Sequence, residues 1–108
     1  MIKTITTPSE KEIKLSSSAG FLYIYKNQFR REPFKDLISM DITNEDEAEN
    51  ILEKVDLEIL YNIAWALAKC ADRSIPEPID FYIENGDFLP LDHIEVITDL
   101  ALYSRCVW

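Results

Sequence analysis

The spacing of apolar side chains along the chain predicts a protein built mainly of helices. The strongest signal comes from residues 57–71, where only Glu58, Asn62 and Lys69 are strongly polar and fall near one narrow line at helical spacing. A helix with so much apolar circumference must be covered by other elements on most sides. We therefore expect a central helix here, with Asp56 as its N-cap. Its expected core residues are Tyr61, Ile63, Ala64, Trp65, Leu67 and Ala68.

Weaker helical patterns lie on both sides of this central segment. Proline is accepted as the first residue of a helix and disfavours helical backbone in the residue before it, so Glu32 and Pro33 separate two of the expected helices. Asn85 and Gly86 are typical of a helix end. The expected helical segments are residues 19–30, 33–40, 45–54, 79–83 and 90–106.

The N-terminal region has a different pattern. Residues 11–15 alternate polar and apolar side chains, which indicates a short strand or an extended lead-in. Residues 1–12 are polar and mixed, and we expect a flexible tail there, followed by a single helical domain over residues 13–108. The predicted fold class is mainly α: a small single-domain bundle of about five or six helices with at most a short N-terminal strand or hairpin.

Composition and charge narrow the function classes. The 108 residues are 47% apolar and 29% charged, which is typical of a globular chain, and the net charge is −9. Residues 1–40 carry 7 Lys/Arg against 4 Asp/Glu, whereas residues 41–108 carry 4 against 16. Such an acidic region repels phosphates and anionic lipids, so we expect neither nucleic acid nor a membrane as a partner. No apolar run reaches the roughly 20 residues of a bilayer span and no signal sequence is evident, so a cytoplasmic protein with reduced thiols is expected.

Reactive side chains are few and scattered. His93 is the only histidine, and its neighbour Asp92 points elsewhere on a helix. Cys70 and Cys106 lack the spacing of a zinc site, and an apolar, acidic setting at Cys70 disfavours a reactive thiolate. The acidic run at residues 45–47 lacks the alternating ligands and glycine of a calcium loop. We therefore expect no catalytic residue, cofactor or metal, and a protein that is not an enzyme.

Aromatic and basic side chains alternate between residues 25 and 35, and the chain ends in an apolar segment. This arrangement indicates a surface for an acidic or aromatic-rich protein partner, although an ordinary solvated helix junction has the same pattern. The candidate partner-binding residues are Tyr25, Phe29, Arg30, Arg31, Phe34, Lys35, Tyr103 and Trp108. Self-association is a second way to bury these aromatic side chains.

The order of the segments resembles a known family. An Ile13-Lys14-Leu15 strand precedes an aromatic helix with Tyr25-Lys26-Asn27-Gln28-Phe29, and the central helix ends in Ala68-Lys69-Cys70-Ala71-Asp72. Ile75-Pro76 then leads into Ile79-Asp80-Phe81-Tyr82. Taken together, from about residue 12 to residue 103, these segments are similar to the tail assembly chaperones of long-tailed phages and prophages of Gram-positive bacteria.

The resemblance implies a role without a catalytic signature. A member of this family is expected to bind the tape-measure protein and to recruit tail-tube subunits in the bacterial host cytoplasm during tail assembly. A small acidic helical regulator or inhibitor of another protein is the alternative that the residues leave open.

Overall fold

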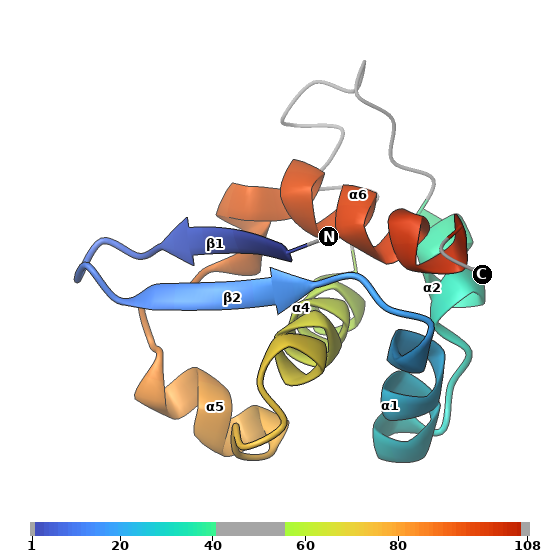
Figure 1. Ribbon diagram of the computed structural model, residues 1–108, viewed down its shortest axis with the longest axis horizontal. Helices are drawn as coiled ribbons and strands as arrows, with labels where there is room; N and C mark the ends of the chain where they lie inside the picture. The colour runs from blue at the N-terminus through green and yellow to red at the C-terminus, as the bar shows by residue number, and fades with distance from the viewer. Residues whose placement is uncertain (1, 41–55, 107–108) are drawn as a thin grey trace.

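The computed structural model describes residues 2–40 and 56–106 (Figure 1). These residues form five α-helices, one 3-10 helix and a two-stranded antiparallel sheet, which confirms a mainly α chain with a short N-terminal strand pair. In chain order the elements are β1 (Ile2–Thr6), β2 (Glu12–Ser16), α1 (Gly20–Phe29), α2 (Pro33–Met40), α4 (Leu57–Ala71), α5 (Pro78–Glu84), η1 (Pro90–His93) and α6 (Ile94–Cys106). The helix expected at residues 45–54 lies outside the described residues.

Helix α4 lies at the centre of the molecule, as its pattern predicts. It contacts β2, α1, α2, α5, η1 and α6, so nearly its whole circumference is covered (Figure 1). Asp56 caps the helix: its Oδ1 accepts hydrogen bonds from the backbone N–H groups of Glu58 at 3.0 Å and Ile59 at 3.4 Å. Of the six expected core residues, all but Tyr61 are buried, and Tyr61 is half-buried.

The two-stranded sheet corrects the expected flexible tail over residues 1–12. Strand β1 pairs with β2 in a register that places Ile5 opposite Ile13 and Lys3 opposite Leu15. Ile5, Ile13 and Leu15 are buried in the common core. The two isoleucines of β1, Ile2 and Ile5, are three residues apart, so the strand lacks the apolar alternation that makes β2 recognisable in the sequence.

The remaining boundaries agree closely with the sequence pattern, with two refinements. Helix α1 ends at Phe29 because Arg30 adopts a left-handed conformation with φ of 59°, and its N–H still donates to the Lys26 carbonyl at 2.9 Å. The last expected helix divides into η1 and α6. Tyr103, one of the candidate partner-binding residues, is 43% exposed. Among the described residues no helix is long and apolar enough to cross a membrane.

Candidate partner-binding surfaces

The aromatic residues of the predicted α1–α2 surface belong to the core or pack against it. Tyr25 is fully buried, so its assignment to a partner-binding surface was wrong. Phe29 and Phe34 are half-buried, and their rings pack edge-on against Trp65 at 5.6 Å and Phe21 at 6.0 Å between centroids. The short loop between α1 and α2 brings α2 against α1 (Figure 1). The ring contacts show that both phenylalanine side chains face the core.

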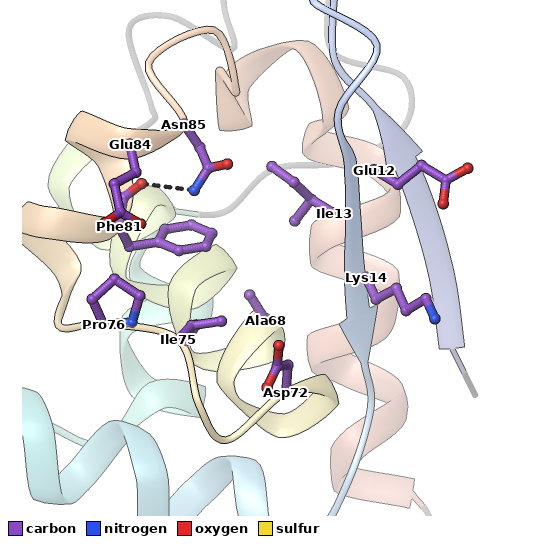
Figure 2. Close-up of a pocket in the computed structure, with 10 residues that line it drawn as sticks. All are labelled: Glu12, Ile13, Lys14, Ala68, Asp72, Ile75, Pro76, Phe81, Glu84 and Asn85. Carbon is purple, nitrogen blue, oxygen red and sulfur yellow. Dashed lines mark hydrogen bonds between the residues drawn. The ribbon is translucent and has the colours of Figure 1, made fainter.

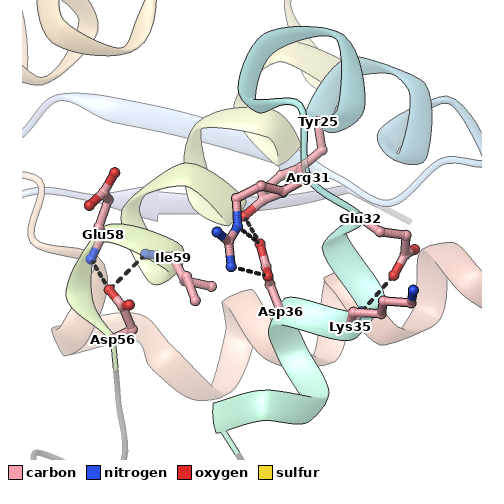
Figure 3. A network of polar contacts seen from close by, with 8 residues as sticks. All are labelled: Tyr25, Arg31, Glu32, Lys35, Asp36, Asp56, Glu58 and Ile59. Atoms are coloured by element: carbon pink, nitrogen blue, oxygen red, sulfur yellow. Dashed lines mark hydrogen bonds and ion pairs between the residues drawn. The ribbon is translucent and has the colours of Figure 1, made fainter.

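A buried carboxylate joins the two helices through a polar cluster (Figure 3). The Tyr25 hydroxyl donates to Asp36 Oδ2 at 2.8 Å, and Arg31 donates from Nε to Oδ2 at 2.9 Å and from Nη2 to Oδ1 at 2.8 Å. The Arg31 hydrogen bonds hold the pKa of Asp36 below its ordinary value, while burial and the neighbouring Asp36 raise the pKa of Tyr25. This cluster holds the end of α1 and the start of α2 together, so Arg31 has a structural role. Even so, 57% of the Arg31 side chain is exposed.

Besides Arg31, two predicted basic residues remain at the surface. Arg30 and Lys35 are both exposed, and the Lys35 backbone N–H donates to Glu32 Oε2 at 2.6 Å. The predicted surface is therefore reduced to cationic side chains without the aromatic partners that the sequence placed beside them. Trp108 lies outside the described residues.

A groove between β1 and α6 contains the other predicted residue, Tyr103. The groove has a volume of about 370 Å³ and is lined by Lys3, Glu95, Val96, Asp99, Leu100 and Tyr103. Val96, Leu100 and Tyr103 follow one another at spacings of four and three residues, so they form one apolar stripe along α6. The sequence did not reveal the groove because Lys3 was placed in a flexible tail, whereas β1 brings it against α6.

Helix α5 presents a second apolar surface that the sequence analysis missed. Ile79 is 76% and Ile83 is 74% exposed, while Phe81 on the opposite side of the same helix is buried. The hydroxyl of Tyr82, which lies between the two faces, donates to the Tyr61 carbonyl of α4. The spacing of four residues between the isoleucines was the available signal, but the sequence alone does not say which face of a two-turn helix meets the core.

A cleft separates β2 from the other side of α5 (Figure 2). Its volume is about 360 Å³, and its walls come from β2, the end of α4, the Ile75–Pro76 segment and α5. Ile13 and Phe81 point toward each other across it, and Asn85 points into it (Figure 2). Asp72 stands at one end and Glu84 at the other. No candidate residue of the sequence analysis lies here, since the cleft joins segments that are about 60 residues apart.

Cys70, His93 and the acidic side chains were the candidates for reactive chemistry. Burial raises the pKa of the Cys70 thiol to about 11, which favours the protonated thiol at neutral pH. His93 is half-buried with its ring 6.1 Å from that of Phe88. Among the side chains that the structure describes, no three from His, Cys, Asp or Glu are placed to hold a metal ion together.

Comparison with known proteins gives no assignment: no protein-family model, curated protein or solved structure matches this chain.

Proposed function

We propose that this protein is a non-enzymatic tail assembly chaperone of a phage or prophage, which binds the tape-measure protein and recruits tail-tube subunits in the host cytoplasm. Two independent lines support the proposal. The first is the resemblance of the ordered sequence segments to that family. The second is a surface suited to a helical protein partner.

The groove between β1 and α6 carries the proposal. An amphipathic helix binds by laying its apolar face into a groove, and the Val96, Leu100 and Tyr103 stripe supplies an apolar floor of this kind. A long, largely helical client such as a tape-measure protein offers many such faces.

The charges around the groove favour a basic client segment. Glu95 and Asp99 lie on α6 along the stripe, and Lys3 on β1 is the one cation among the six lining residues. A client helix with Lys or Arg beside its apolar face pairs with the two carboxylates, so binding weakens as salt concentration rises.

Co-expression with fragments of a tape-measure protein tests the proposal. Tyr103→Ser is the test variant, and Tyr23→Ser is its matched control, because Tyr23 is a 69% exposed tyrosine on α1. We expect the parent and Tyr23→Ser to retain a tape-measure fragment during purification, and Tyr103→Ser to lose it. If the parent binds no tape-measure fragment at low or high salt, the chaperone proposal fails and the acidic regulator becomes the better interpretation. If both tyrosine variants bind as the parent does, the client uses another surface.

A further inference from the structure

The outer edge of β2 has unused hydrogen-bonding capacity. The Thr7 N–H donates to the Lys11 carbonyl at 2.9 Å, so these two residues form a hydrogen-bonded pair. Hydrogen-bonded and non-hydrogen-bonded pairs alternate along an antiparallel ladder. Ile5 and Ile13 therefore form a hydrogen-bonded pair, and Thr4 and Lys14 form a non-hydrogen-bonded pair. The backbone N–H and C=O groups of Glu12 and Lys14 therefore point away from β1, toward the cleft beside α5.

The Ile75–Pro76 segment forms the wall opposite β2, and both of its backbone carbonyl groups already accept hydrogen bonds. Trp65 Nε1 donates to the Pro76 carbonyl at 3.0 Å, and Lys69 Nζ donates to the Ile75 carbonyl at 2.8 Å. Pro76 has no N–H to offer. A segment that enters the cleft can pair its backbone with the outer edge of β2, while the Ile75–Pro76 wall limits how far it can move away.

Two contacts hold the cleft open at the hairpin end. Lys11 Nζ donates to the Glu84 carbonyl at 2.7 Å, and the Ser9 N–H donates to Asp87 Oδ2 at 2.7 Å. These bonds tie the β1–β2 turn to the end of α5 and to the residues after it. These contacts therefore fix the spacing between β2 and α5 at this end of the cleft.

The cleft is chemically suited to a short extended peptide. Ile13, Ala68 and Phe81 form an apolar floor, on which every second side chain of a strand would rest. Asp72 accepts hydrogen bonds from the N–H and the hydroxyl of Ser74, which lower its pKa, so it carries a negative charge at neutral pH. The charged residues that line the cleft are three carboxylates, Glu12, Asp72 and Glu84, and one ammonium group, that of Lys14, which also helps to lower the Asp72 pKa. The side chains of Glu12 and Lys14 point to the other side of the strand (Figure 2).

We propose that the cleft between β2 and α5 binds an extended, basic segment of a partner protein, which adds a third strand to the sheet along the outer edge of β2. Charge complementarity selects this occupant over a second copy of the chain, because the two copies would each carry a net charge of −9. This surface is separate from the groove beside α6, so the inference does not rest on the proposed function.

The first test uses synthetic peptides and the full chain. A blocked peptide of alternating valine and lysine is titrated into the ¹⁵N-labelled protein, beside a glutamate-for-lysine version and a version N-methylated at the amide groups facing β2. We expect saturable shifts at residues 12–14 and at α5, with slower hydrogen exchange of the Glu12 and Lys14 amides. N-methylation or glutamate should each weaken binding by about tenfold or more. Equal binding of the three peptides, or shifts confined to other elements, would overturn the inference.

A pair of proline variants tests the edge itself. Thr4 and Lys14 are partners in the register, and their N–H groups point to opposite outer edges of the sheet. Lys14→Pro should abolish peptide binding, whereas Thr4→Pro, which stresses the sheet equally, should preserve it. If Lys14→Pro does not fold, the double variant Asp72→Asn with Glu84→Gln serves instead, and should weaken the lysine peptide severalfold at low salt. Shifts at β2 that depend on protein concentration alone would assign the edge to a second copy and contradict the proposal.

Discussion

The hydroxyl of Tyr25 lies 2.8 Å from Asp36 Oδ2 and donates a hydrogen bond to it, which joins the middle of α1 to the first turn of α2 (Figure 3). Arg31, at the loop between the helices, completes the cluster from outside. Tyr25, which the sequence pattern placed on a binding surface, therefore has a structural role. The first prediction concerns this cluster.

Asp36→Asn should lower the free energy of unfolding by about 1.5–3 kcal/mol, because hydrogen bonds to a charged group are lost at a buried site. Asp80→Asn, at an exposed carboxylate on α5, should change it by less than about 0.5 kcal/mol. Urea denaturation followed by circular dichroism measures both. Equal stability of the two variants would mean that the Asp36 cluster does not stabilise the packing of α1 against α2.

The same cluster predicts a pH dependence. The pKa of Asp36 is lower in the folded protein than its ordinary value of 3.8, so its stabilising effect is complete above that value. The effect is lost as the pH falls through the folded pKa. The difference in unfolding free energy between the parent and Asp36→Asn should be constant from about pH 5 to 8 and shrink below about pH 4. A difference that grows on acidification would contradict the sign of the shift.

Trp65 is buried against Phe29 and donates from Nε1 to the Pro76 carbonyl. Trp65→Asp places an unpaired charge in the core and should cost about 4 kcal/mol or more. Trp65→Phe keeps most of the apolar volume and should cost less, mainly through the lost hydrogen bond. Thermal denaturation ranks the variants, and a Trp65→Asp protein as stable as the parent would show that this side chain is not part of the core.

Cys70 should react slowly with iodoacetamide in the folded state. A pKa of about 11 in place of 9.0 lowers the thiolate fraction at pH 8 by about a hundredfold. Mass spectrometry of the Cys70 peptide over time measures the rate, and the protection should vanish in denaturant. Equal rates in the folded and unfolded states would mean that the thiol is accessible.

Substitutions on the exposed face of α5 should have little effect on stability, whereas substitution of its buried residue should be strongly destabilising. Ile79→Gln and Ile83→Gln should each change the free energy of unfolding by less than about 0.5 kcal/mol, because both side chains are largely exposed. Phe81→Ala should cost about 3–5 kcal/mol, since it opens a cavity in the core. Chemical denaturation separates the two classes.

The sequence by itself determined the helices whose patterns are strong and local. Asp56 as a cap and an almost wholly apolar circumference define α4, and Pro33 defines the start of α2. These features depend on residues within one or two turns, so no distant contact is needed to predict them.

Only the tertiary structure decided which side chains form surfaces. Strand β1 exists because β2 offers it a partner, and its two isoleucines, three residues apart, give too little pattern to reveal it. The burial of Tyr25 depends on Asp36 from another helix, and the cleft beside β2 joins segments about 60 residues apart. Exposure is a property of packing between elements, so the local pattern alone does not say which apolar faces remain uncovered, as the exposed Ile79 and Ile83 of α5 show.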